Sequence, residues 1–200
     1  MRKTFIQQLL MAVVLLVASN YKLNAQNNVE LWGALASGGI DNLGTLGHYN
    51  LTTSTWTTDY DFTTPFPGSN SKQSQLTEVD GKQYGIIGGG AHGAGLLFEW
   101  DPATNVYTKK FDFSPVNGSG PVGSLTYYDG KLYGMTQSGG ANSLGVVFEY
   151  DVTGVSYTKL LDFNGGNGST PGYGNLMEIC SSPTVAGSIS LSNSSICETS

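Results

Sequence analysis

Few side chains in this 200-residue chain are suited to chemistry, and most of those recur at fixed spacing. His48 and His92 are the only histidines, and neither has a serine or carboxylate at a repeated distance. A catalytic triad needs a base held between a nucleophile and an acid, so we predict no catalytic residue of that kind. A carboxylate pair for glycoside hydrolysis would occur once in a protein. Asp61, Asp112 and Asp162 instead recur in an Asp-Phe motif, which favours a structural role.

A pair of glycines recurs at a regular spacing in the chain, at 38–39, 89–90 and 139–140. The loop that follows each of these pairs varies in its side chains, while the residues around the loop stay constant. The glycine-rich stretch Gly88–Gly95 is similar to a phosphate loop, but no helical pattern follows it, and Ser138–Gly145 fills its place in the next copy. We therefore predict no phosphate site there. Loops on rigid scaffolds often bind ligands, and unconstrained loops vary in the same way. The residues that we predict as a ligand-binding loop face are Asp41, Asn42, His92, Asn142 and Ser143.

These loops belong to a unit of about 50 residues that occurs three times, a period typical of solenoids and propellers. The second copy runs from Lys82 to Phe113 and the third from Lys131 to Phe163. A looser first copy runs from Glu30 to Phe62. One aromatic position recurs in all three, as Trp56, Tyr107 and Tyr157. Its fixed place in the unit predicts packing between units rather than sugar stacking.

Each unit reads as four short strands with no helical period. Asp-Gly pairs such as Asp129-Gly130 suit a tight hairpin, because glycine tolerates a positive φ angle. The pattern predicts an all-β fold, made of β-propeller-type blades of four antiparallel strands. For the third copy, the expected strands are Ser124–Tyr128, Lys131–Thr136, Gly145–Tyr150 and Tyr157–Phe163, and a last strand is expected at about Tyr173–Ile179.

The repeated string resembles two known repeat families. The residues YYDGKLYG, then GG, VFEYD and YTK, resemble the kelch repeat. Tyr133–Gly140 and Gly145–Phe148 resemble the GloVer-type repeat, whose units read YG-T-x-x-GG-x-x-x-x-G-x-VF, still more closely. Residues 29–179 carry the resemblance, and the first copy departs from it at Gly47. Such repeats occur in secreted or surface proteins of bacteria, mostly without an assigned activity, so the resemblance implies location and fold.

The expected strands are enough for three blades, but in permuted order: the first blade lacks its first strand, and one extra strand follows the third blade. Propellers usually have about four to eight blades. The chain is then a fragment, which we favour, or two copies assemble six blades, or the repeats form an open array. Further blades or a second copy would be needed to close the propeller.

The first 25 residues have the order of a secretory signal peptide. Arg2 and Lys3 precede an apolar run at Leu9–Ala18, and a small-residue cleavage site ends at Ala25. Ten apolar residues rise only about 15 Å as a helix, too little to cross a bilayer. We expect export to the cell surface or medium, and no membrane insertion after cleavage.

The expected domains are therefore the signal peptide 1–25, the repeat domain 26–179 and the segment 180–200. That last segment is either a Ser-rich linker or the start of an Ig-like module, since it resembles the opening of PKD-like domains. Cys180 and Cys197 either pair in an oxidising compartment or await other partners. Two Cys and two distant His are too few for a metal site, so we expect no metal and no cofactor.

The charge distribution excludes one class of partner. After residue 25 the chain has six Lys, no Arg and all fifteen of its acids, which disfavours nucleic acid and anionic membranes. The leading hypothesis is a non-catalytic exported module that binds an extracellular glycan or protein, or acts as structural spacing. The alternative is a fragment of a secreted carbohydrate-active enzyme, a lyase or hydrolase, with its active site in missing blades.

Overall fold

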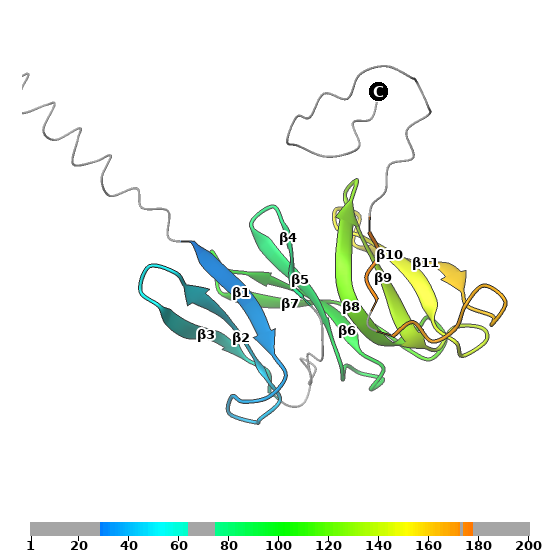
Figure 1. The fold of residues 1–200 in the computed structure, drawn as a ribbon, viewed down its shortest axis with the longest axis horizontal. Coiled ribbons are helices and arrows are strands. Elements are labelled where there is room, and N and C mark those ends of the chain that lie inside the picture. The colour runs from blue at the N-terminus through cyan, green and yellow to red at the C-terminus, as the bar shows by residue number, and fades with distance from the viewer. Residues whose placement is uncertain (1–28, 64–74, 173, 178–200) are drawn as a thin grey trace, which may run out of the picture. The chain divides into compact units, whose positions relative to one another are not determined.

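A computed structural model describes residues 29–63, 75–172 and 174–177. All of its regular elements are strands, and they form three sheets (Figure 1). The first sheet holds β1 (Glu30–Leu35), β2 (Thr45–Asn50) and β3 (Thr55–Asp61). The second holds β4 (Thr77–Val79), β5 (Lys82–Ile87), β6 (Leu96–Asp101) and β7 (Val106–Asp112). The third holds β8 (Ser119–Tyr128), β9 (Lys131–Ser138), β10 (Val146–Asp151) and β11 (Ser156–Asp162).

Each sheet is an antiparallel meander in which neighbours along the chain pair with one another. Tight hairpins produce this order, as at Asp129-Gly130, where both residues have positive φ angles of 48° and 76°. The second and third sheets also share an irregularity. The register shifts by one residue between Leu97 and Phe98 in β6, and between Val147 and Phe148 in β10. The same local geometry therefore recurs one repeat later.

The all-β prediction and the four-stranded unit are confirmed for the second and third copies. The propeller itself stays a prediction. The strand expected at Tyr173–Ile179 is not formed within Gly174–Met177, and its other residues lie outside the described ones. β8 begins at Ser119, earlier than predicted, because Ser119 and Pro121 pair with Ser138 and Thr136 of β9. The predicted signal peptide, Cys180 and Cys197 also lie outside the described residues.

The chain divides into two compact units. Among the described residues, one comprises Val29–Leu31 and Tyr49–Thr57. Its turn after β2 is held by Asn50, whose Oδ1 accepts from the amides of Thr52 and Thr53 at 2.9 and 3.0 Å. The other comprises Trp32–His48 and the described residues from Thr58 onward, and it contains all the buried hydrophobic side chains of the described part of the chain.

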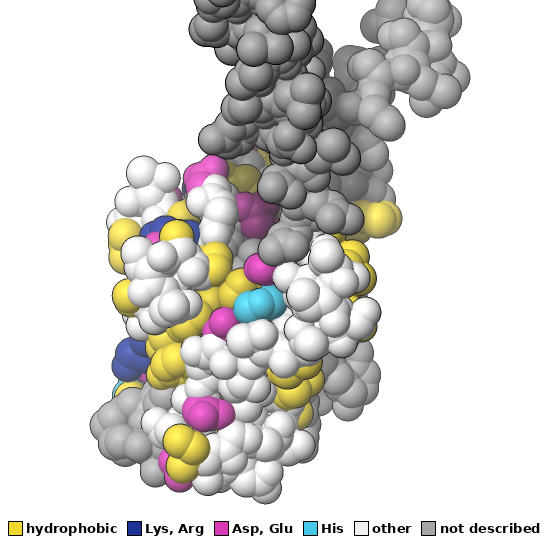
Figure 2. Space-filling view, turned by 90° about the vertical axis from the view of Figure 1, so that its left-hand side faces the viewer, with side chains coloured by type: hydrophobic (Ala, Val, Ile, Leu, Met, Phe, Trp, Pro, Cys, Tyr) yellow, Lys and Arg dark blue, Asp and Glu magenta, His cyan; other side chains and the backbone are white. Residues whose placement is uncertain are grey.

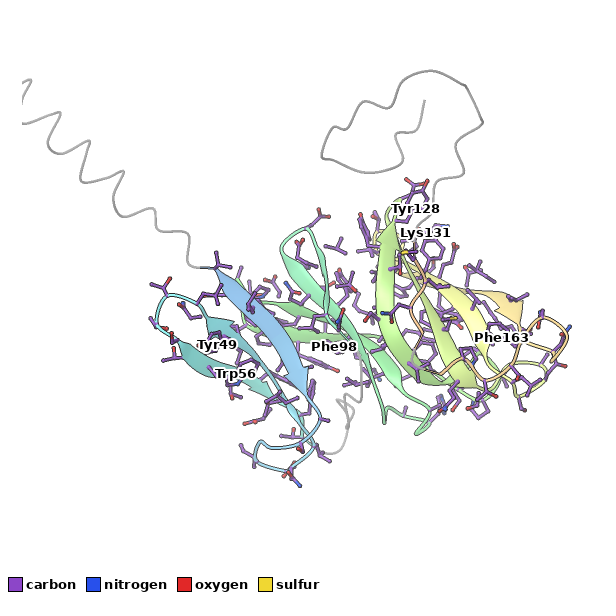
Figure 3. All side chains as sticks on the ribbon, in the orientation of Figure 1. Tyr49, Trp56, Phe98, Tyr128, Lys131 and Phe163 are labelled. Carbon is purple, nitrogen blue, oxygen red and sulfur yellow. The ribbon has the colours of Figure 1, made fainter. Side chains whose placement is uncertain are left out.

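Consecutive sheets of this larger unit meet through a recurring set of aromatic contacts, which we name the aromatic joint. In the first joint Tyr60 stacks on Tyr107, with ring centroids 4.8 Å apart and planes 4° apart, and Phe62 meets Phe98 edge-on at 6.0 Å. Figure 3 labels Phe98 on its strand. Both Phe62 and Phe98 are fully buried. Apolar burial of this kind is the dominant stabilising term in folding, and edge-on ring geometry adds to it.

The second joint repeats the first one sheet further along. Phe111 stacks on Tyr157 with centroids 4.0 Å apart and planes 3° apart, and Phe113 meets Phe148 edge-on at 5.1 Å. Phe113 and Phe148 are fully buried. The prediction that Tyr107 and Tyr157 pack between repeat units is confirmed. Trp56, at the same position in the first copy, is 40% exposed.

Candidate functional site

The three glycine-rich loops have one backbone frame. In each, an amide reaches back six residues to a glycine carbonyl: Gly44 to Gly38 at 3.1 Å, Gly95 to Gly89 at 2.8 Å and Gly145 to Gly139 at 3.1 Å. Inside that closure a second, shorter turn is bonded at Asn42, Gly93 and Ser143 respectively. The frame is therefore set by the backbone, and the side chains are left to vary.

The repeated Asp-Phe aspartates hold these loops onto their own sheets. Asp112 Oδ1 accepts from the Ala91 amide at 3.0 Å, and Asp162 Oδ1 accepts from the Ala141 amide at 2.7 Å. Asp61 lies against Gly39 at the same place in the first loop. The structural role predicted for the recurring acids is thus observed as a turn hydrogen bond.

Lysines reinforce two of these aspartates. Partial burial disfavours the charged form of Asp112, but the Lys109 ammonium and the Ala91 amide hold its pKa below its ordinary value. The Lys159 ammonium, 2.9 Å away, and the Ala141 amide lower the pKa of Asp162. Both carboxylates are consequently ionised at neutral pH and serve as acceptors, which is unsuited to general-acid chemistry.

The structure places the five predicted loop residues in two groups. Asn42 and Ser143 have positive φ angles of 56° and 57° and lie at the turn, and Asn42 Oδ1 accepts from the Gly38 amide at 3.0 Å. They therefore shape the loop. Asp41, His92 and Asn142 occupy one equivalent position on the frame and are exposed. Asn142 also donates to the Phe163 carbonyl at 2.9 Å, so it holds the loop as well as occupying the exposed position.

Each of the last two loops is bonded to the connection that follows its sheet. The Gly120 amide donates to the Ala94 carbonyl at 2.8 Å, and the Thr170 amide donates to the Leu144 carbonyl at 2.7 Å. The Gly140 amide also donates to the Pro115 carbonyl at 2.9 Å. Each of these loops and the chain that leaves its sheet therefore lie at the same end of that sheet.

Among the described residues, the buried carboxylate of Glu99 in the second sheet has several donors around it. Glu99 of β6 accepts from Lys82 at 2.7 Å and from the Tyr84 hydroxyl at 2.6 Å, and Lys110 lies 3.1 Å away. Burial opposes the charged form, but these donors lower the Glu99 pKa to about 2. Burial and the same bond raise the pKa of Tyr84. A carboxylate with so low a pKa is a weak base at neutral pH, which indicates a structural role.

The first sheet has a different cross-strand pair at the same place in the repeat. His48 stands where Glu99 stands one repeat later, and Asp59 stands where Lys110 stands. His48 Nδ1 lies 2.7 Å from Asp59 Oδ2, and its ring centroid lies 4.8 Å from that of Trp32. His48 therefore has both a carboxylate partner and a ring partner. Asp59 was not predicted from the sequence as the partner of His48. Aligning the first copy with the second would have indicated the pair, because Glu99 and Lys110 occupy the equivalent positions.

The described part of the chain has neither a cluster of metal ligands nor a membrane-spanning helix. Within residues 29–63, 75–172 and 174–177, no three His, Cys, Asp or Glu side chains are grouped so as to hold a metal ion. The same residues contain no helix of the length and apolarity needed to span a bilayer.

The comparison with protein families agrees with the repeated geometry. The model of the Gloeobacter/Verrucomicrobia repeat matches residues 16–195. The chain belongs to this repeat family. Membership confirms the tandem-repeat prediction, and a repeat family accords with the structural roles found for the recurring acids and aromatics of this Gloeobacter/Verrucomicrobia repeat protein. No curated protein matches the chain.

Proposed function

We propose that this chain is an exported, non-catalytic repeat module of β-propeller type, which binds an extracellular glycan or protein through its glycine-rich loops. The observation that carries the proposal is the identical backbone frame of the three loops, with Asp41, His92 and Asn142 at its equivalent exposed position. A constant frame with variable side chains presents different contacts from one rigid scaffold.

The fold supports this role in two ways. Four-stranded meander sheets that stack in series are the building units of propellers, whose loops at one end commonly bind ligands. The recurring Asp112 and Asp162 carboxylates are committed to the Ala91 and Ala141 amides, and Glu99 is committed to its lysines and Tyr84. These acids are therefore occupied in holding the scaffold, which leaves the variable loop positions to make contacts.

The proposal is tested by binding of the purified chain to a glycan array and to a panel of bacterial surface proteins. A His92→Ala/Asp41→Ala variant should bind about tenfold or more weakly, because loss of one good contact costs about 1.4 kcal/mol. The matched control is Thr104→Ala, in the exposed turn at the opposite end of β6. It should bind like the wild type.

The outcomes separate the candidate roles. Binding to glycans and binding to proteins are distinguished by the two panels. If neither panel binds, the binding role is wrong and structural spacing is left. If the loop variant binds as well as the wild type, the ligand lies elsewhere on the molecule.

A further inference from the structure

The sequence Asn-Gly-Ser occurs twice, at 117–119 and at 167–169, in equivalent places of two repeats. Each asparagine lies in the connection that follows the last strand of its sheet. Asn117 Oδ1 accepts from the Ser114 amide at 2.6 Å, and Asn167 Oδ1 accepts from the Asn164 amide at 2.8 Å. The same reactive sequence thus stands in two turns of the same kind.

An asparagine that precedes a glycine can lose its side-chain amide with water as the only other reactant. The backbone nitrogen of the glycine loses its proton and attacks Cγ of the asparagine. The new N–Cγ bond closes a succinimide ring, and the Cγ–Nδ2 bond breaks to release ammonia, which takes up the proton. Water then opens the ring. Breaking the new N–Cγ bond gives an aspartyl residue, and breaking the original peptide C–N bond gives an isoaspartyl residue.

The attack depends on the peptide unit that joins the two residues. This planar unit carries both the asparagine carbonyl and the glycine amide. It must rotate about the bond between Cα and the carbonyl carbon of the asparagine until the nitrogen faces Cγ. Hydrogen bonds to its carbonyl or its amide resist that rotation, and a bond from the amide also opposes the loss of its proton.

The first copy is held at both ends of this peptide unit. Tyr157 donates through its hydroxyl to the Asn117 carbonyl at 2.5 Å. The Gly118 amide donates to the Ser114 carbonyl at 2.9 Å. Gly118 is also buried, and a Cβ placed there would lie 2.8 Å from Thr136. The peptide unit therefore has neither the freedom to rotate nor the space for a succinimide ring.

The second copy is held less firmly. The Gly168 amide lies 3.4 Å from the Gly165 carbonyl, which makes a long hydrogen bond. Asn167 and Gly168 are both exposed. A Cβ placed at Gly168 would meet the ring of Phe163, which Figure 3 labels, at 3.4 Å. The peptide unit has room to rotate here, and water reaches the ring that forms.

A third Asn-Gly pair, Asn164-Gly165, lies in the same turn as Asn167. Asn164 Oδ1 accepts from the amides of Gly166 and Asn167, at 3.0 Å each. The Gly165 amide donates to the Gly168 carbonyl at 2.9 Å. Among the glycine amides of the three Asn-Gly pairs, that of Gly168 therefore has the longest hydrogen bond.

We propose that Asn167 is a site of spontaneous deamidation in the folded chain, and that the fold protects the identical sequence at Asn117. The modification removes a contact that fixes the turn. Asn167 Nδ2 donates to the Asp162 carbonyl at 3.2 Å. The carboxylate that replaces the amide has no proton to donate, and it places negative charge against that carbonyl oxygen.

The modified turn lies beside the third glycine-rich loop. Asn142 of that loop donates to the Phe163 carbonyl at 2.9 Å, and the Thr170 amide donates to the Leu144 carbonyl at 2.7 Å. These two bonds join the loop to the chain on both sides of the turn. Deamidation of Asn167 therefore loosens the support of one loop of the three and adds a negative charge next to it.

The added charge makes the product separable. The chain has a net charge of −6 at pH 7, and its surface in Figure 2 shows acidic side chains with few Lys or Arg. An anion-exchange column should retain the chain, and it should retain the deamidated chain more strongly.

The experiment incubates the purified full chain in mildly alkaline buffer and follows each Asn-Gly pair by peptide mass spectrometry. Asn167 should convert about tenfold faster than Asn117, which corresponds to a difference of about 1.4 kcal/mol between the two barriers. In concentrated urea the fold is lost, and the two Asn-Gly-Ser copies should convert at similar rates. Both rates should rise with pH, because the glycine amide must lose its proton.

The matched variant is Tyr157→Phe. It keeps the ring that stacks on Phe111 and removes the hydroxyl that holds the Asn117 carbonyl. Deamidation of Asn117 should accelerate toward its rate in urea, whereas that of Asn167 should not change. Circular dichroism checks that the variant folds, and the comparison of folded and unfolded wild type stands without it.

Four results would overturn the proposal. Equal rates at Asn117 and Asn167 in the folded chain mean that the fold does not protect the first copy. The same ratio of rates in urea means that the local sequence sets it. Faster conversion of Asn164 than of Asn167 means that the glycine amide bond does not control the reaction. An Asn167 that converts only in urea is itself protected by its turn. None of these results involves a ligand, so failure of this modification and failure of the proposed function are distinguishable.

Discussion

At the scale of single residues, the informative side chains are those that recur and have an assigned partner. Asp112 and Asp162 bind loop amides, and Tyr157 donates through its hydroxyl to the Asn117 carbonyl at 2.5 Å. Asn117 Oδ1 in turn accepts from the Ser114 amide at 2.6 Å. The Asn-Gly-Ser sequence at 117–119 therefore serves a turn, and it needs no glycan to explain it.

Glu99 gives a prediction for stability against pH. Its folded pKa of about 2 lies below the ordinary value of 4.5, so its contribution is complete above about pH 4.5 and is lost as the pH falls toward 2. Glu99→Gln should lower the free energy of unfolding at neutral pH by on the order of 3 kcal/mol. When the free energy of unfolding is measured by urea denaturation at a series of pH values, its decrease at acid pH should be smaller in this variant than in the wild type.

The matched control for Glu99 is Glu149→Gln in the third sheet. Glu149 bonds Lys131 at 2.8 Å, but Leu160 stands where the second sheet has Lys110. Because this site lacks the counterpart of Lys110, Glu149→Gln should lower the free energy of unfolding at neutral pH by less than Glu99→Gln does. An equal loss from both substitutions would contradict the special role of the Glu99 cluster.

At the scale of elements, the glycine-rich loops depend on space as well as on backbone angle. Gly140 and Gly130 have similar φ angles, 79° and 76°. A Cβ at Gly140 would collide with the Asp162 carboxylate and Val146, whereas a Cβ at Gly130 meets nothing within 4 Å. Gly130→Ala should cost about 1 kcal/mol for the backbone angle alone, and Gly140→Ala about 1–3 kcal/mol more. Equal unfolding free energies would exclude the loop-to-aspartate contact.

The elements were largely predictable, because their signals are local. Asp129-Gly130 marks a hairpin by itself, and the strands β9 and β10 begin at, or within one residue of, the positions that the sequence predicts. The strand expected at Tyr173–Ile179 fails for a physical reason. Strand pairing needs a partner, and the described residues contain none for Gly174–Met177.

The candidate site was predictable only in part. The positions Asp41, His92 and Asn142 follow from variation on a constant frame. The use of Asn42 and Ser143 in the turn depends on backbone angles that no residue pattern displays. The stacking of Tyr60 on Tyr107 depends on how far apart two sheets lie. The repeat length in the sequence gives no information on that distance.

At the scale of the whole molecule, the free energy of unfolding should be the sum of a contribution from each sheet and a contribution from each aromatic joint between sheets. Deleting Leu76–Ser124 removes one full repeat and leaves Phe62 ahead of the third sheet, in the place of Phe113. This variant should unfold cooperatively at a lower denaturant concentration than the wild type. A deletion of equal length at Trp100–Phe148 cuts inside β6 and inside β10. It joins the remaining strand halves one residue out of register, because Glu99 and Glu149 are equivalent, and it should abolish the cooperative transition. If both deletions fold, or neither does, the joint is not the unit of assembly.

Chains built from similar repeats face the risk that a strand pairs with the wrong copy of its partner. The different pair of the first sheet counteracts this error. If β6 paired with β3, the carboxylates of Glu99 and Asp59 would face each other. If β2 paired with β7, Lys110 would lose its Glu99 counter-ion. Either exchange would leave a partly buried charge without an opposite partner, at a cost of several kcal/mol. The different pair in the first sheet thus favours pairing of each strand within its own sheet over pairing with the similar strand of another copy.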